Sequence, residues 1–200
     1  HEAAMNGHLD VVRFFIEQGC DINLYDCTGK SILYLVVEGE YYNFAKYLLS
    51  LGATVFPDGR YAKKTKNQSL TKQQTSKSKH RSKRVFPDPI SLASSQNEDM
   101  LLLLLDHIDI NKYIIGHFEL KSDDSPEKRK NRIFNSFIKY QSEKLLDILI
   151  EQKVFETDWA DLYCHVINAK SEKLAILMFN KQLPFSFTSE LITYFVKFKN

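Results

Sequence analysis

The chain has 200 residues, of which 44% are hydrophobic and 26% are charged, a composition typical of a soluble globular protein. It has no apolar run of the roughly 18 residues that a membrane-spanning helix requires, and no signal-peptide pattern at its start. Its three cysteines are an odd number without paired spacing, which argues against a disulfide framework or a Cys-x-x-Cys zinc site. We therefore expect a protein without a transmembrane segment, with reduced thiols, in the cytoplasm or the nucleus.

The net charge of +2 conceals an uneven distribution along the chain. Between Arg60 and Arg84 there are ten Lys or Arg residues and no Asp or Glu. The rest of the chain has 17 basic and 25 acidic residues, which gives it a formal charge of −8. The sequence therefore predicts an acidic body that carries one strongly basic insert.

The first part of the chain repeats with a period of 33 residues. Segments 11–23 and 44–56 align without a gap, and apolar residues recur in both at helical spacing. Gly7 and Gly19 stand where a helix has to stop and the backbone has to adopt a positive φ. The apolar residues that we expect to pack one repeat on the next are Val11, Phe14, Phe15 and Ile16.

This segment also resembles the ankyrin repeat family in its residues. Asn6-Gly7-His8-Leu9-Asp10 resembles the family's turn into the second helix, and Gly19-Cys20-Asp21-Ile22-Asn23 resembles the loop that follows that helix. Asp26-Cys27-Thr28-Gly29 is similar to the tip of the family's β-hairpin. Ser31-Ile32-Leu33-Tyr34 stands where the family usually has Thr-Pro-Leu-His, so the histidine that hydrogen-bonds between repeats is missing there. His1 occupies that position in the preceding, truncated repeat.

The repeat pattern is interrupted by the basic insert and then resumes. We expect residues 57–85 to form this insert and to be disordered, because they are polar and carry charge of one sign. Asp88-Pro89-Ile90-Ser91-Leu92-Ala93 resembles the opening of a repeat, and Asp109-Ile110-Asn111 resembles its exit loop. The sequence thus predicts a degenerate ankyrin repeat over residues 86–120.

Two further helical patterns follow a polar loop that we expect at residues 121–131. Ser142-Glu143-Lys144-Leu145 matches Ser171-Glu172-Lys173-Leu174 at an offset of 29 residues, and each begins an apolar run at helical spacing. These patterns predict degenerate helical repeats over 132–200, the last of which is truncated. The ankyrin repeats are expected over 1–56, and the first of them is truncated. The expected fold is all-α: an ankyrin-type solenoid of helix–turn–helix units with short β-hairpin loops and a disordered basic insert.

Three short patterns superficially resemble catalytic or metal-binding motifs. His1-Glu2 lacks the second histidine of a zinc-protease motif, and Gly29-Lys30-Ser31 lacks the earlier glycine of a phosphate-binding loop. Cys164-His165 lies within a predicted helix and has no identifiable partner ligand nearby. We therefore expect a binding protein and not an enzyme, without catalytic residues, cofactor or metal ion.

The ankyrin family binds partner proteins through a concave face of hairpin tips and first helices, and the resemblance implies the same surface here. The aligned tip and the nearby helix turn provide seven candidate contact residues: Tyr25, Asp26, Thr28, Lys30, Glu38, Tyr41 and Tyr42. Tyrosine suits an interface because it buries a large area and keeps a polar group, but packing between repeats is an equal alternative for each tyrosine. We expect a monomeric scaffold or adaptor for a protein partner that the sequence does not identify.

The basic insert allows three interpretations. It is a solvated loop without a function, a segment for nuclear import or protein docking, or a contact site for nucleic acid or an anionic membrane. Nucleic acid is the less favoured partner, because only Tyr61 and Phe86 flank the tract whereas single-strand binding uses interleaved aromatic residues. A further alternative is that residues 1–200 are the recognition arm of a larger protein. The residues that resemble a nuclear-import signal or a docking cluster are Lys77, Lys79, Arg81, Lys83 and Arg84.

Overall fold

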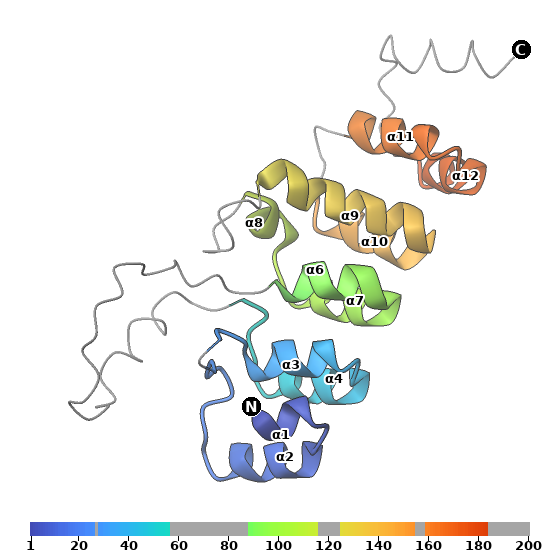
Figure 1. The fold of residues 1–200 in the computed structure, drawn as a ribbon. Coiled ribbons are helices and arrows are strands. Elements are labelled where there is room, and N and C mark those ends of the chain that lie inside the picture. Colours follow the sequence, from blue (N-terminus) through green and yellow to red (C-terminus); the bar gives the residue numbers. More distant parts are fainter. Residues whose placement is uncertain (27, 57–87, 116–124, 155–158, 184–200) are drawn as a thin grey trace, which may run out of the picture. The chain divides into compact units, whose positions relative to one another are not determined.

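The computed structural model describes residues 1–26, 28–56, 88–115, 125–154 and 159–183 (Figure 1). These residues form helices and turns and contain no β-strand, which confirms the predicted all-α fold class. None of the described helices is long and apolar enough to cross a membrane. The basic insert expected at residues 57–85, with its cluster from Lys77 to Arg84, lies outside the described residues.

The chain divides into two compact units, and the first comprises His1–Ile108 with Ile115–Ser125. Its described helices form three consecutive pairs: α1 (Glu2–Met5) with α2 (Leu9–Glu17), α3 (Ile32–Glu38) with α4 (Tyr42–Ser50), and α6 (Pro89–Gln96) with α7 (Glu98–Asp106). The first helices of successive pairs contact one another, α1 with α3 and α3 with α6, and α4 contacts α7. Successive pairs therefore pack on one another, as in a repeat protein.

Two helices of the first unit, α3 and α6, begin at capping residues in segments that the sequence indicates as the openings of repeats. The hydroxyl oxygen of Ser31 accepts a hydrogen bond from the Tyr34 N–H at 3.0 Å at the start of α3. At the start of α6, the Asp88 carboxylate accepts a hydrogen bond from the Ile90 N–H at 2.9 Å, and Pro89 occupies the first helical position. The segment that resembles the opening of a repeat is therefore a helix start.

Helix α2 is covered on one side only. The residues 33 positions after Val11 and Phe15 are Phe44 and Leu48, and both are buried in α4. The prediction that the apolar residues of α2 pack between repeats is therefore wrong for three of the four, because α2 packs on α1 and no described helix covers its other side. Their side chains remain 45% exposed for Val11, 57% for Phe14 and 52% for Phe15.

The second unit comprises Asp109–Ile114 with Pro126–Asn200. Its described helices are α8 (Ile110–Ile115), α9 (Pro126–Tyr140), α10 (Glu143–Glu151), α11 (Trp159–Asn168) and α12 (Glu172–Asn180). Helix α11 contacts both α9 and α12. The starts of α10 and α12 are 29 residues apart, which is the offset that the sequence shows.

The expected polar loop at residues 121–131 is wrong for its second half, because α9 already begins at Pro126. Proline is tolerated at the first helical position. The negative charge of Glu127 in the first turn interacts favourably with the positive, N-terminal end of the helix dipole. Arg129 is buried and donates a hydrogen bond from its guanidinium to the backbone oxygen of Tyr113 at 3.1 Å. The charged residues that suggest a loop are thus part of an amphipathic helix.

The repeat expected at residues 86–120 is divided between the two units. The Ile110 N–H donates to the side-chain oxygen of Gln152 at 2.9 Å, and the Asn111 side-chain amide donates to the Gln152 backbone oxygen at 3.0 Å. Residues 110–115 are helical and not an open exit loop. These contacts are consistent with the assignment of Asp109–Ile114 to the second unit, whereas α6 and α7 belong to the first.

Several of the described turns contain a residue in the left-handed backbone conformation. Gly7 and Gly19 have φ values of +73° and +85°, which confirms the role predicted for these glycines. The same conformation occurs in five residues that are not glycine: Glu40, Gln141, Lys153, Lys170 and Gln182. Turns of the second unit therefore adopt the positive φ values seen in the first unit, but at residues that are not glycine.

Replacing Gln141 by glycine is expected to stabilise the second unit by up to about 1 kcal/mol. A side chain at a φ of +50° is strained, and glycine removes this strain although it makes the unfolded chain more flexible. Urea denaturation followed by the fluorescence of Trp159, the single tryptophan, reports on this unit. Gln141→Ala is the control, because alanine keeps the strain; an equal gain from both substitutions would contradict the prediction.

Candidate functional site

A β-hairpin turn connects the first and second helix pairs. Tyr25 and Ser31 form an isolated antiparallel bridge. Within it, the Asp26 N–H donates to the Lys30 oxygen at 2.9 Å and the Gly29 N–H donates to the Asp26 oxygen at 3.1 Å. Gly29 has a φ of +87°, a conformation that favours glycine. The predicted hairpin tip is thereby confirmed, with Cys27 outside the described residues.

The carboxylate of Asp26 holds the tip together. One of its oxygens accepts hydrogen bonds from the Thr28 N–H at 2.8 Å, the Thr28 hydroxyl at 2.7 Å and the Lys30 N–H at 2.9 Å. Burial by itself raises the pKa of Asp26, but the hydrogen bonds from Thr28, Lys30 and Gly29 outweigh it and lower the pKa. The tip therefore presents Thr28 and Lys30 in a fixed geometry.

Lys30, Tyr34 and Glu38 lie four residues apart along the chain, at one side of α3. The Lys30 ammonium is 2.8 Å from both carboxylate oxygens of Glu38 and 5.3 Å from the centre of the Tyr34 ring. The hydrogen bond to Glu38 raises the pKa of Lys30. Burial raises the pKa of Tyr34, and so do the negative charges of Glu38 and Asp88. We call Asp26, Thr28, Lys30, Tyr34 and Glu38 the tip–helix surface.

Four of the seven predicted contact residues belong to this surface, and the three tyrosines do not. The Tyr41 ring packs against Gly39 and Gly7, where an added Cβ would lie 2.5 Å from the tyrosine oxygen. Tyr41 therefore fills the space between two helix pairs. Tyr42 is exposed at the start of α4, and Tyr25 is half-buried in the hairpin bridge. Their role as contact residues stays a prediction.

Tyr34 is not among the predicted contact residues, because its position corresponds to the histidine of the family's repeat opening. The available signal was its spacing of four residues before Glu38, which places these two side chains on one face of α3, next to Lys30 of the hairpin tip.

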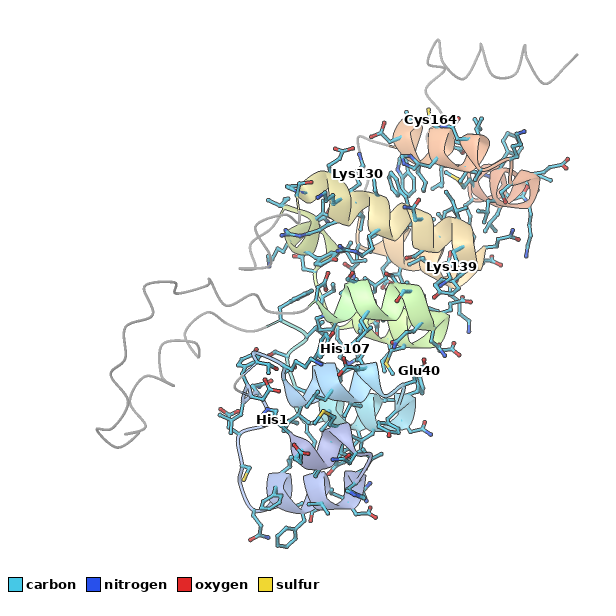
Figure 2. All side chains as sticks on the ribbon, in the orientation of Figure 1. His1, Glu40, His107, Lys130, Lys139 and Cys164 are labelled. Carbon is cyan, nitrogen blue, oxygen red and sulfur yellow. The ribbon has the colours of Figure 1, made fainter. Side chains whose placement is uncertain are left out.

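Two polar side chains connect successive parts of the first unit. A ring nitrogen of His1 lies 2.9 Å from the Leu24 backbone oxygen, which fits the inter-repeat role expected for this histidine (labelled in Figure 2). The Asn23 side chain donates to the Gly52 oxygen at 3.2 Å and accepts from the Thr54 N–H at 2.7 Å. These bonds fix the position of the hairpin relative to the helices behind it.

The Cys164-His165 pair lies in α11, and the His165 ring packs within the second unit. His165 has a ring nitrogen 2.9 Å from the Asp161 backbone oxygen, and its ring centre lies 4.8 Å from that of Phe134. The part of the chain that the structure describes contains no group of three or more His, Cys, Asp or Glu side chains able to hold a metal ion. The tip–helix surface, by contrast, presents hydrogen-bonding groups, the Tyr34 ring and the charged groups of Lys30 and Glu38.

The two units differ in charge. The described residues of the first unit include eleven Asp or Glu and three Lys or Arg, a formal charge of −8. Those of the second unit include seven acidic and eleven basic residues, a formal charge of +4. The acidic character that the sequence assigns to the whole body is therefore concentrated in the first unit.

Replacing Asp26 by alanine is expected to destabilise the first unit by about 1 to 2 kcal/mol at neutral pH, because three hydrogen bonds are lost. The folded-state pKa of Asp26 is lowered, so its contribution is present above the unfolded pKa of about 4 and is lost as the pH falls further. Urea denaturation at several pH values, followed by circular dichroism, measures this dependence. Asp10→Ala, at an exposed carboxylate of α2, is the control; equal losses from both substitutions would refute the role of Asp26.

Comparison with known proteins identifies the family of the N-terminal part of the first unit. Residues 1–58 match the family model described as ankyrin repeats (3 copies), so this part of the chain consists of ankyrin repeats. No solved structure is significantly similar to the chain.

Three curated relatives match over 53 residues each, which is 26% of this chain. Protein phosphatase 1 regulatory subunit 27 is 40% identical in Mus musculus and 38% identical in Homo sapiens. Ankyrin repeat domain-containing protein oryK of Aspergillus oryzae is 38% identical. The match spans 34% of each phosphatase subunit and 8% of the fungal protein, so only a repeat segment of each relative is shared.

Proposed function

We propose that this protein is a protein–protein interaction scaffold or adaptor that binds its partner through the tip–helix surface. The observation that supports this most is the rigid hairpin tip, where one carboxylate oxygen of Asp26 accepts three hydrogen bonds and orients Thr28 and Lys30. A preorganised surface binds better because less conformational entropy is lost on association. The match of residues 1–58 to ankyrin repeats, which are protein-interaction modules, supports the same function.

The name of the mammalian relatives describes regulatory subunits of a phosphatase, which fits a non-catalytic role. We extend only the role of a binding subunit to this chain, and not the phosphatase partner, because the shared segment is a third of those proteins. Fold similarity defines a class of function and leaves the partner open.

The test is an affinity retention experiment with the full chain, carried out over a series of salt concentrations. The proposal expects that the same proteins are retained by the full chain and by a variant lacking residues 60–84, and that Thr28→Arg in the tip abolishes their retention. The affinity for nucleic acid falls steeply as the salt concentration rises, whereas the affinity of a protein partner for the tip–helix surface need not. Retention that disappears with residues 60–84, or that consists of nucleic acid or anionic lipid, would instead support the basic insert as the functional segment.

A further inference from the structure

We propose that the tip–helix surface recognises a Lys or Arg side chain of its protein partner, which binds against Tyr34 and the carboxylate of Glu38. This inference rests on the proposed function and specifies the chemistry of the partner. The observation behind it is that the surface already holds one ammonium group, that of Lys30.

Lys30 shows how a cation fits this surface. Its ammonium lies 2.8 Å from both oxygens of Glu38 and 5.3 Å from the centre of the Tyr34 ring. An aromatic face beside a carboxylate attracts ammonium and guanidinium groups through charge and through the ring quadrupole. The side chains of Lys30 and Glu38 are 30% and 39% exposed, so a second cation can reach the same carboxylate from solvent.

The charges around this position favour a cation and disfavour an anion. Lys30 is neutralised by Glu38, and the negative charge of Asp88 also acts on Tyr34. Among the described residues of the first unit, the other two Lys or Arg side chains are on the second helices of their pairs: Arg13 of α2 lies over the Tyr47 ring at 5.1 Å, and Lys46 is in α4. A partner cation therefore meets a surface where the carboxylates outnumber the single, already paired ammonium.

A substitution of Lys30 distinguishes the sign of the partner's charge. If the partner supplies a cation, Lys30 competes with it for Glu38, and Lys30→Gln strengthens binding. If the partner supplies an anion, Lys30 is its contact, and the same substitution weakens binding.

The experiment measures binding of a fluorescent oligolysine peptide to the full chain by fluorescence anisotropy, with oligoglutamate as the probe of opposite charge. We expect Lys30→Gln to tighten oligolysine binding about two- to fivefold. Glu38→Gln and Tyr34→Leu should each weaken it by a similar factor, because each removes half of the cation-binding pair. Lys46→Gln is the matched control: it changes the net charge equally on an exposed position of α4 and should leave binding nearly unchanged.

Each of the following outcomes would overturn the inference. They are weaker oligolysine binding to Lys30→Gln, equal tightening by Lys46→Gln, and preferential binding of oligoglutamate. A further variant with glutamine at all ten Lys and Arg positions from Arg60 to Arg84 removes the chain's own cations as competitors. If that variant also fails to bind oligolysine, the inference is refuted.

The proposed function is judged separately. If the retained proteins still depend on Thr28 while oligolysine does not bind, only the cationic nature of the partner is wrong.

Discussion

Replacing Phe134 by alanine is expected to lower the free energy of unfolding of the second unit by about 3 to 5 kcal/mol. Phe134 is fully buried in α9, and its ring packs edge-to-face on His165 of α11 with 4.8 Å between the ring centres. The Lys130 ammonium lies 5.6 Å from the centre of the same ring and 2.6 Å from an Asp161 carboxylate oxygen. The cavity left by alanine would therefore weaken both the apolar contact and the polar contact between α9 and α11.

Urea denaturation followed by Trp159 fluorescence measures this loss, because Trp159 is the single tryptophan and is buried at the start of α11. Phe179→Ala is the matched control, since it is the same substitution in the same unit on a side chain that is 77% exposed. We expect less than about 0.5 kcal/mol for the control. Similar losses from the two substitutions would show that α9 and α11 do not share the core described here.

Replacing Asn23 by alanine is expected to destabilise the first unit by about 2 to 3 kcal/mol. The Asn23 side chain donates to the Gly52 oxygen at 3.2 Å and accepts from the Thr54 N–H and hydroxyl at 2.7 and 3.0 Å. Each of these hydrogen bonds contributes about 1 kcal/mol, and alanine leaves three backbone or hydroxyl groups without this partner.

Hydrogen exchange of the first unit is the suitable measurement, because it detects local opening in a repeat protein. Asn6→Ala provides the control: its side-chain amide donates to the Glu2 oxygen within its own helix pair at 2.9 Å. We expect faster exchange in α3 and α4 for Asn23→Ala and little change there for Asn6→Ala. Unchanged exchange in Asn23→Ala would mean that this side chain does not connect the two helix pairs.

The sequence predicts the repeat architecture of the first unit well, because ankyrin repeats are built from local signals. The 33-residue period locates α2 and α4, and Gly7, Gly19 and Gly29 have the positive φ values that their positions indicate. The Asp-Pro pair at 88–89 likewise identifies the start of α6. These features depend on neighbouring residues alone.

Features that depend on tertiary contacts were not predictable in the same way. The spacing of Val11 and Phe15 indicates an apolar helix face but not whether a neighbour covers it. The start of α9 lies in a charged segment, and the burial of Arg129 and its hydrogen bond to the Tyr113 oxygen are tertiary contacts that the charge pattern does not indicate. Gln141 adopts a glycine-like conformation that the residue type does not indicate.

The candidate site was predictable in part. The hairpin tip follows from the resemblance, and Asp26, Thr28, Lys30 and Glu38 meet in the structure. Tyr34 was overlooked because its position suggested a structural substitute for histidine. Its place between Lys30 and Glu38 becomes apparent only once α3 is formed.

The central claim is that the partner contacts the hairpin tip and the adjacent face of α3. The most direct test places a photo-crosslinking amino acid at Thr28 in one full-length variant and at Lys46 of α4 in another. Both positions are exposed, but only Thr28 belongs to the tip–helix surface. We predict that the retained partner cross-links to the probe at Thr28 and not to the probe at Lys46. A cross-link at Lys46 with none at Thr28 would contradict the claim.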